Sequence, residues 1–367
     1  MLKYILLSII LVFSSLNAKE YYINSLNGSD TTSSFDGLSP NKSFKSIHKA
    51  LNLVEQGDII IIEGKSKDKA LIYKENIIVG ENMPFFIIRG KDNPTIKSND
   101  DNRNIGVLAL NKDIRIEGLT FDGFVDGKMS DINKNGGAAI VIKDGFRDAV
   151  INNCKFINCN YGIIANENQS IRINGNEFTK ITKLSNKPLD GGIAIQILSH
   201  DKYIQDNQIG TEAKNTFSEI DNYGILIGNN DKLVLADYSK IENNTFSNSK
   251  GCGIALFNVE GIVSVTKNIF DKCETSLEIK GLSVDAIISD NVFKGATGNY
   301  EVLSDENYPG DLLYSIWKGN NNTFTNKLHG VSENNEQSIK SIDGKRFITT
   351  NEKLLKSSIK GDMKILD

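Results

Sequence analysis

The sequence predicts an all-β solenoid, a parallel β-helix with a period of about 23 residues. The first sign is a repeated unit of Ile or Val, a polar pair, Asn, and then Phe or Ile, as in Ile173-Asn-Gly-Asn-Glu-Phe178. The repeated Asn is found at Asn153, Asn176, Asn207, Asn244, Asn268, Asn291 and Asn322, in steps of 23, 31, 37, 24, 23 and 31 residues. A fixed period with occasional insertions is typical of a solenoid.

The second sign is an apolar run, often introduced by Gly, between these units, as in Tyr223-Gly-Ile-Leu-Ile227. Apolar residues alternate in it as in a strand, and no period has room for a long helix. We expect the Asn side chains to stack at one corner and a Phe column to stack inside, formed by Phe156, Phe178, Phe246, Phe270 and Phe293. A leucine-rich repeat has a similar period, but it needs a Leu-dominated pattern and usually a helical return segment.

Residues 1–18 have the pattern of a secretory signal peptide, with Lys3 before a short apolar core and Ala18 at the expected cleavage site. An uncleaved membrane anchor is the alternative. We therefore expect a periplasmic or secreted protein, with no membrane segment once the signal is removed.

Residues 19–64 are expected to cap the first coil. The apolar stripe from Phe44 to Val54 predicts a helix, with Ser43 as its N-cap and Gly57 after its end. The run of Ile residues at 59–62 predicts a strand that is buried on both faces. A cap of this kind protects the open end of a solenoid.

This N-terminal segment, from Tyr22-Ile-Asn24 through Asp36-Gly-Leu-Ser-Pro40 to Gly57-Asp-Ile-Ile-Ile-Ile-Glu-Gly64, resembles that of secreted bacterial right-handed parallel β-helix proteins. With the Ile-x-Asn-Asn-x-Phe coils it is similar to the pectate-lyase-like superfamily, which includes polysaccharide lyases and mannuronan epimerases. The resemblance implies a right-handed β-helix, in agreement with the handedness of parallel crossovers. The coils are expected over residues 65–325, and a C-terminal cap and tail over residues 326–367.

Composition limits the partners. The chain has 367 residues and a net charge of −4, so it has no basic excess that would favour nucleic acid. We expect a monomer. Cys252 and Cys273 are almost one period apart and are candidates for a disulfide, with buried free thiols as the alternative. Cys159 and Cys273 are expected in one column, several coils apart.

Four insertions are expected to leave one corner of the solenoid, at residues 122–135, 179–190, 210–222 and 294–309. Loops from the same corner would form a wall beside a sheet, and such a groove is a candidate binding site. Of the acidic residues in these loops, Asp122, Asp126 and Asp221 are candidate ligands for Ca²⁺, which prefers oxygen ligands. The alternative is that these carboxylates only keep the loops soluble.

Removal of a proton α to a uronate carboxylate needs a base and a positive charge. The candidate catalytic residues are Lys143, Arg147, Arg172 and His200. The candidates for substrate binding are Tyr161, Tyr203, Tyr223 and Asp190. The Asp-Pro-His signature of mannuronan epimerases is absent around His200, where the sequence reads Ser199-His-Asp201.

The resemblance and these residues predict a secreted, carbohydrate-active β-helix, a polysaccharide lyase-like enzyme that cleaves acidic glycans by β-elimination. The alternative is a β-helix without catalytic activity that binds glycans or has a structural role at the cell surface or in the periplasm. A metal-assisted hydrolase is a third hypothesis. The expected partner is an acidic polysaccharide, and Ca²⁺ is the candidate cofactor.

Overall fold

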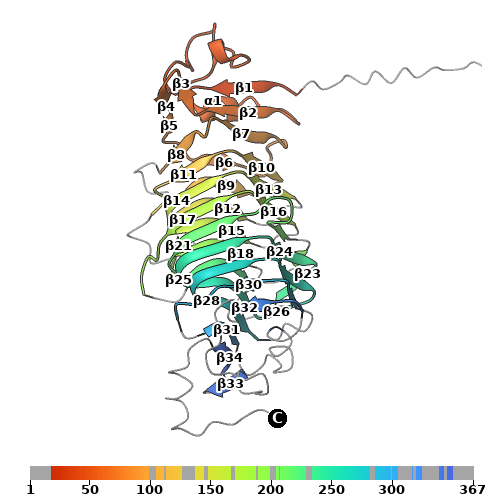
Figure 1. Ribbon diagram of the computed structural model, residues 1–367. Coiled ribbons are helices and arrows are strands. Elements are labelled where there is room, and N and C mark those ends of the chain that lie inside the picture. The colour runs from red at the N-terminus through yellow and green to blue at the C-terminus, as the bar shows by residue number, and fades with distance from the viewer. Residues whose placement is uncertain are drawn as a thin grey trace, which may run out of the picture.

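The structure is a computed structural model that describes residues 18–98, 105–110, 113–125, 137–143, 148–166, 170–186, 189–198, 204–205, 207–228, 234–281, 286–298, 300–304, 316, 320–324, 339–342 and 345–349. Its coils stack along one axis as a right-handed parallel β-helix (Figure 1). The predicted fold class is confirmed.

Each coil contributes strands to three faces. Face A is a ten-stranded sheet of β1 (Glu20–Ile23), β2 (Ile59–Glu63), β7 (Ile87–Lys91), β10 (Ile114–Glu117), β13 (Ala149–Asn152), β16 (Ile171–Asn174), β20 (Gln208–Ile209), β24 (Ser239–Glu242), β27 (Val263–Thr266) and β29 (Ile287–Ser289). Face B contains β5 (Ile72–Tyr73), β8 (Thr95–Lys97), β11 (Thr120–Asp122), β14 (Lys155–Cys159), β17 (Glu177–Ile181), β21 (Thr216–Ile220), the first parts of β25 (Thr245–Phe257) and β28 (Ile269–Lys280), β30 (Val292–Phe293) and β32 (Thr323–Phe324).

Face C follows face B in every coil. It contains β6 (Ile77–Val79), β9 (Ile105–Leu110), β12 (Ala138–Lys143), β15 (Tyr161–Asn166), β18 (Ile193–Leu198), β22 (Tyr223–Gly228), the second parts of β25 and β28, and β31 (Tyr300–Ser304). Because β25 and β28 pass from face B to face C without interruption, the two faces form one sheet. We name the corners after the faces that they join: AB, BC and CA.

Smaller elements lie at the corners and ends. They are the helical turn η1 (Pro40–Lys42), the hairpin of β3 (Lys65–Ser66) and β4 (Lys69–Ala70), the parallel trio β19 (Ile204–Gln205), β23 (Val234–Asp237) and β26 (Val259–Glu260), and the C-terminal strands β33 (Ile339–Ile342) and β34 (Lys345–Thr349). Strand β34 pairs antiparallel with β31, and β33 pairs antiparallel with β34. Among the described residues, no helix is long and apolar enough to cross a membrane.

The N-terminal helix α1 (Ile47–Leu51) is shorter than the sequence predicts. Ser46, not Ser43, is its N-cap and accepts from the backbone N–H of Lys49 at 3.2 Å. The helix cannot begin at Phe44, because the backbone of Phe44 bonds to Tyr22 and lies beside β1. Ile47, Ala50 and Leu51 are buried, and the helix contacts β1 and β2. The capping role of this segment stays a prediction.

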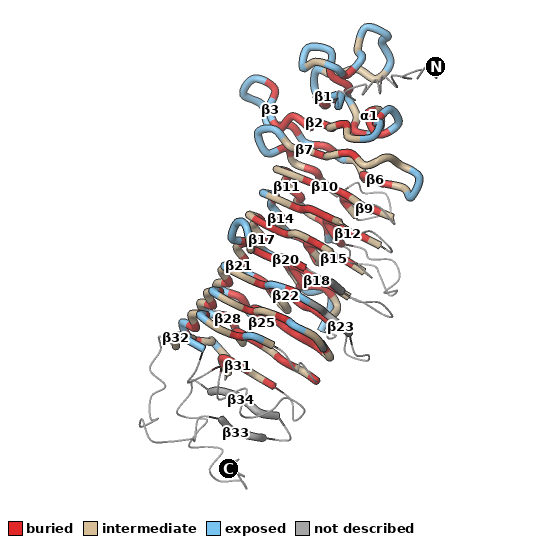
Figure 2. Tube along the Cα trace, turned by 90° about the vertical axis from the view of Figure 1, so that its right-hand side faces the viewer, coloured by how far each residue is buried: buried red, intermediate tan, exposed pale blue. Residues whose placement is uncertain are grey.

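Phenylalanine rings form a continuous stack inside the solenoid. Rings of neighbouring coils lie nearly parallel, with centroids 4.5 Å apart between Phe156 and Phe178 and 5.1 Å apart between Phe246 and Phe270. The stack runs through Phe121, Phe156, Phe178, Phe217, Phe246, Phe270, Phe293 and Phe324. The predicted Phe column is therefore confirmed, and it is longer than predicted. Figure 2 shows that buried residues follow the strands of each coil, whereas exposed residues gather at turns.

The Gly that introduces the second apolar run makes room for these rings. A Cβ atom at Gly162 would lie 2.8 Å from the ring of Phe178 and 2.5 Å from the carbonyl oxygen of Ala194. At Gly253 a Cβ atom would lie 2.7 Å from the ring of Phe270. Close packing between faces B and C therefore favours a small residue at this position, where Ala139 and Ala194 stand in two of the other coils.

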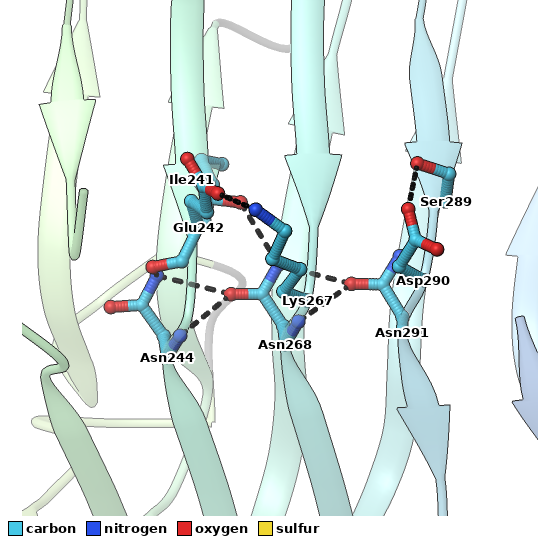
Figure 3. Close-up of polar contacts among 8 residues, drawn as sticks. All are labelled: Ile241, Glu242, Asn244, Lys267, Asn268, Ser289, Asp290 and Asn291. Atoms are coloured by element: carbon cyan, nitrogen blue, oxygen red, sulfur yellow. Dashed lines mark hydrogen bonds and ion pairs between the residues drawn. The ribbon is translucent and has the colours of Figure 1, made fainter.

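Asparagine side chains form a ladder at corner AB (Figure 3). Oδ1 of each Asn accepts from the backbone N–H and the amide of the Asn in the preceding coil, as Asn268 does from Asn244 at 2.9 and 3.1 Å. The amide of Asn268 donates in turn to Ile241 O at 2.9 Å and to Asn291 Oδ1 at 3.1 Å. The ladder consists of Asn176, Asn215, Asn244, Asn268, Asn291 and Asn322.

The prediction of the Asn column is wrong for two residues, Asn153 and Asn207. Cys154 stands in the ladder position where Asn153 was expected, and its backbone N–H donates to Asn176 Oδ1 at 2.8 Å. Asn207 lies just before the face A strand β20, and Asn215 takes its place in the ladder. A Cys side chain has neither an amide oxygen to accept from the preceding coil nor an amide N–H to donate to the next, so the ladder of side-chain hydrogen bonds ends at Cys154.

The insertions do not all leave one corner. The segments between β11 and β12, between β17 and β18, and between β30 and β31 join face B to face C at corner BC. The last of them is shorter than predicted, because residues 300–304 of the predicted insertion 294–309 form strand β31 and residues 305–309 lie outside the described residues. The segment at 210–215 lies at corner AB, and residues Thr216–Ile220 of the same predicted insertion form strand β21. The predicted wall of loops therefore loses its third member.

All four cysteines are buried free thiols. Cys159 and Cys273 share an inward column, as expected, through Ile181, Ile220 and Ser249. Cys252 pairs in register with Thr275 and not with Cys273, so the alternative of free thiols holds. Burial raises the pKa of the Cys159 thiol to about 12, which makes it a poor nucleophile.

Candidate functional site

Successive residues of a strand point to opposite faces of a sheet, so every second residue of face A points outward. At one outward position the register runs through Ile87, Arg115, Val150, Arg172, Gln208, Lys240, Ser264 and Ile287. From Arg115 to Lys240, basic residues therefore occupy alternate coils at this position. We name Arg115, Arg172 and Lys240 the cation column. The inward neighbours on the same strands are buried apolar or small residues, which fix the orientation of the column.

Arg115 belongs to a small charged network with the neighbouring coil. Its Nε donates to Glu117 Oε1 at 2.6 Å, and Arg89 Nε donates to Glu117 Oε2 at 2.9 Å. Burial raises the pKa of Glu117, but the hydrogen bonds and positive charges of the two arginines outweigh it and hold the pKa below its usual range. Glu117 thus remains ionised, and the network carries a net charge of about +1 at neutral pH.

Arg172 and Lys240 are held less firmly. Nη2 of Arg172 lies 3.2 Å from Asp148 Oδ1, but that oxygen accepts no hydrogen bond from the described residues. Lys240 is exposed and forms no ion pair with any described residue. Both cations can therefore turn toward a ligand at little cost.

Face A is locally positive in an acidic chain. Its ten strands carry five basic residues, Arg89, Lys91, Arg115, Arg172 and Lys240, and four acidic residues, Glu20, Glu63, Glu117 and Glu242. Their net charge is +1, and it is +3 over the strands from β7 to β29, whereas the whole chain has a net charge of −4. A local excess of this kind attracts anions even when the protein as a whole is acidic.

The amides beside the column leave polar atoms without partners. Asn152 and Asn174 face each other on neighbouring strands at the second outward position of face A. Oδ1 of Asn152 and Nδ2 of Asn174 form no hydrogen bond with any residue that the structure describes, although Asn174 is only 2% exposed. Buried polar groups are usually paired, so a donor and an acceptor without partners beside Arg172 are consistent with a site for a hydroxyl-rich ligand.

The sequence-predicted site residues are distributed over different faces. Arg172 lies on face A and Lys143 at the end of β12 on face C; Tyr161 and Tyr223 lie on face C, and Asp122 lies on face B. Asp190 and Asp221 lie at corner BC. Arg147, His200, Tyr203 and Asp126 lie outside the described residues.

The groove predicted to unite these residues is not formed by the ones that the structure describes. Neither Lys143 nor Arg172 forms an ion pair with Asp122, Asp190 or Asp221. The expectation that one basic residue reaches two of the named carboxylates is therefore wrong for these two. The reason is geometric: residues close in sequence across a corner of a β-helix point outward from different faces.

The predicted carboxylates have partners of their own. Asp122 lies 2.9 Å from Lys97 Nζ and accepts from Asn158 at 2.9 Å. Asp221 lies 3.8 Å from Lys250 Nζ, and Asp190 bonds with the hydroxyl of Ser185.

Asp122 and Asp221 cannot ligate the same Ca²⁺. They stand three coils apart, or ~14 Å at the spacing of parallel strands, which exceeds the reach of a cation that binds its oxygens at ~2.4 Å. No group of three or more His, Cys, Asp or Glu suited to a metal occurs among the described residues. Ca²⁺ binding thus stays a prediction.

Tyr161 and Tyr223 share one outward column of face C, with Ile193 between them. The hydroxyl of Tyr161 donates to Leu189 O at 2.9 Å and accepts from Gly191 N–H at 2.8 Å. It therefore fixes the corner BC loop that precedes β18, and burial raises its pKa. Its predicted role in substrate binding remains a prediction, with the hydroxyl already occupied.

Tyr223 lies in a second polar cluster on face C. Its ring meets Phe257 edge-on at 5.6 Å, and Lys280 Nζ lies 2.8 Å from Glu278 and 4.3 Å from the centre of the Phe257 ring. Burial, followed by the negative charge of Glu278, raises the pKa of Tyr223 far above its usual range. The phenol stays protonated at neutral pH, so Tyr223 can donate a proton but cannot act as a base.

Comparison with known proteins agrees with this architecture. A family described as "Right handed beta helix region" matches residues 86–258. The chain is a right-handed β-helix. Among solved structures, the native GH136 lacto-N-biosidase from Eubacterium ramulus is similar, with 13% sequence identity and a TM-score of 0.39 over 83% of this chain and 68% of that chain. A similarity at this level does not indicate a shared substrate. No curated protein is significantly similar to the chain.

Sequence reasoning found Arg172 but missed Arg115 and Lys240. The signal was present, because Arg115 in Ile114-Arg-Ile116 and Arg172 in Ile171-Arg-Ile173 occupy the same place in the β-helix repeat. The sequence does not give the register of the strands. Because of the insertion before β24, only the strand pairing shows that Lys240 occupies the same outward position as Arg115 and Arg172.

Proposed function

We propose that this β-helix is a carbohydrate-active protein that holds an acidic, uronate-containing polysaccharide lengthwise along face A. The observation that supports the proposal is the cation column, with Arg115, Arg172 and Lys240 at one register position of a locally positive face. Guanidinium groups match carboxylates in shape and charge, and parallel coils repeat along the axis as sugars repeat along a chain.

We propose β-elimination as the reaction. After a proton is removed from the carbon α to a uronate carboxylate, negative charge develops on that carboxylate, and a nearby cation stabilises it. Arg172 is the candidate for the cation that stabilises this negative charge. Arg147, the residue before Asp148, and His200 remain candidates for the base, together with Lys143. We also propose that the protein acts in the periplasm or the medium, because residues 1–18 have the pattern of a signal peptide.

Binding without catalysis is the second candidate function. It is favoured by the state of Glu117, the carboxylate beside Arg115, whose low pKa makes it a weak base. Glu242 lies two residues beyond Lys240 on β24, as Glu117 lies two residues beyond Arg115, and its carboxylate accepts from Lys267 Nζ at 2.6 Å. No His lies on the described strands of face A.

The reaction is tested by incubating the mature protein with uronate polysaccharides, with and without added Ca²⁺. β-Elimination creates a conjugated double bond at the new non-reducing end, so it is followed by ultraviolet absorbance. Absorbance that grows with time supports the lyase. Tight binding without new absorbance would establish the second candidate, and loss of both would refute the proposed function.

Removal of the cation column is expected to weaken binding of a uronate oligosaccharide roughly tenfold. Exposed ion pairs contribute ~0.2–1 kcal/mol each, and a tenfold change corresponds to ~1.4 kcal/mol. The variant is R115Q/R172Q/K240Q, measured by calorimetry at low and at physiological salt. Its matched control is K155Q/K250Q/K272Q, which removes the same charge from face B and corner BC.

The control separates a site from a general field. If both triple variants weaken binding equally, the effect comes from net charge and face A is not the binding surface. The difference should also shrink as salt rises, because exposed charges are screened.

A further inference from the structure

The cations of face A recur with a period of two coils. Along the outward position the order is Arg115, Val150, Arg172, Gln208, Lys240, so each pair of cations is separated by one uncharged residue. Neighbouring parallel strands lie ~4.8 Å apart, which places the cations ~10 Å from one another. The column thus presents positive charge at regular intervals, and not as a continuous stripe.

The residues between the cations do not suit a negative group. Val150 is apolar and only 8% exposed, and it lies between Arg115 and Arg172 in the register. Glu117 lies two residues beyond Arg115, and Asp148 two residues before Val150. An anion over Val150 would lose water without gaining a cation, and it would be repelled by these carboxylates. The apolar face of a sugar ring fits there better.

We propose that face A selects a linear polysaccharide that presents one carboxylate toward the protein at every second sugar. This inference rests on the proposed function, that face A binds an acidic polysaccharide. In an extended polysaccharide one sugar advances the chain by about as much as one coil advances the solenoid. Carboxylates on alternate sugars would therefore meet Arg115, Arg172 and Lys240 in turn, and the sugars between them would lie over Val150 and Gln208.

The same outward position offers two sites for an added cation. Ser264 follows Lys240 by one coil, and Ile287 follows it by two. Ile287 is 51% exposed, and Ser264 is partly exposed. The substitution Ile287→Lys therefore continues the series in phase, whereas Ser264→Lys adds the same charge out of phase, directly beside Lys240.

We expect Ile287→Lys to raise the affinity for a hyaluronan oligosaccharide roughly threefold, the range of one exposed ion pair. Hyaluronan carries a carboxylate on every second sugar, which makes it a suitable probe. Ser264→Lys is expected to change the affinity by much less. The gain should appear only with oligosaccharides long enough to reach the added cation, since the footprint grows from five coils to seven, or from ~19 to ~29 Å between the outermost cations.

A second measurement uses the unmodified protein. Oligogalacturonate of the same length as the hyaluronan probe carries a carboxylate on every sugar. It should bind no more tightly than hyaluronan, because its additional carboxylates find no cation. Tighter binding of oligogalacturonate by tenfold or more would overturn the inference.

The outcomes of the substitutions are distinct. Equal gains from Ile287→Lys and Ser264→Lys, or a larger gain from Ser264→Lys, show that only charge density matters and overturn the inference while the proposed function stands. If neither gain occurs and R115Q/R172Q/K240Q also leaves binding unchanged, the proposed function fails with it. Circular dichroism and thermal unfolding of each variant confirm that the fold is kept.

Discussion

Replacing Asn268 by Leu is expected to lower the free energy of unfolding by ~2–6 kcal/mol, because two buried backbone groups lose their partners at ~1–3 kcal/mol each. These groups are the N–H of Asn244, which donates to Asn268 Oδ1 at 2.9 Å, and the carbonyl of Ile241, which accepts from the Asn268 amide at 2.9 Å. Both lie at a corner from which water is excluded, since Asn268 has no exposed surface. Denaturant titration measures the change.

The last rung of the ladder provides the control. Asn322 makes equivalent bonds to Ile288 O and to Asn291, but it is partly exposed. Water can replace the bonds lost in Asn322→Leu, so this substitution should cost clearly less. Equal effects of the two substitutions, or a loss below about 1 kcal/mol at Asn268, would show that the ladder contributes little to stability.

Replacing Phe270 by Ala is expected to lower the free energy of unfolding by ~3–5 kcal/mol, as for other large buried aromatic residues. Its ring lies 5.1 Å from both Phe246 and Phe293, and the residue is 1% exposed. Because the coils of a solenoid contact only their neighbours, loss of one ring also weakens the coupling between the coils on either side. We therefore expect a broader unfolding transition as well as a lower midpoint.

Phe270→Leu and Phe324→Ala are the matched variants. Leu keeps most of the buried volume and should cost less than Ala does. Phe324 closes the stack at the last described coil and is partly exposed, so its loss should be tolerated better. If all three substitutions have the same small effect, the ring stack is not the stabilising core of the solenoid.

The sequence predicted the fold well, because the repeat contains both the Asn of the corner ladder and the Phe of the interior stack. Asn and Phe recur two residues apart at Asn176 and Phe178, and again at Asn268 and Phe270. Each coil must satisfy the same corner and fill the same interior, so the same residues return. Periodicity of this kind can be read without any knowledge of the structure.

The errors in register have one physical origin. The segment Ile204-Gln-Asp-Asn-Gln-Ile209 has the same pattern as the repeat, but it does not supply the ladder residue of its coil. Because of the insertion that follows it, the Asn at corner AB is Asn215. A pattern records which residues recur, but it does not record where extra residues enter a coil. The missing Phe217 and the misplaced insertion at 210–222 both follow from this single displacement.

The candidate site could be predicted only in part for a related reason. Arg172 was identified as a cation, but its neighbours in space, Val150 and Asp148, come from another coil. The sequence-based grouping instead joined residues that are near one another in the chain, such as Lys143, Tyr161 and Asp190. Lys143 and Tyr161 lie on neighbouring strands of face C and Asp190 lies at corner BC, whereas Arg172 lies on face A. The chain turns at three corners between neighbouring strands of one face, so residues near one another in the sequence are separated in space.

The antiparallel pairing of β34 with β31 has a consequence for how copies of this chain can associate. All strand pairs from β6 to β31 on face C are parallel, and an open parallel edge could accept a strand from another molecule and extend into a fibre. Strand β34 occupies the edge of β31, and β33 pairs with β34 in turn, so two strands of the same chain fill the place that a strand of another molecule could take.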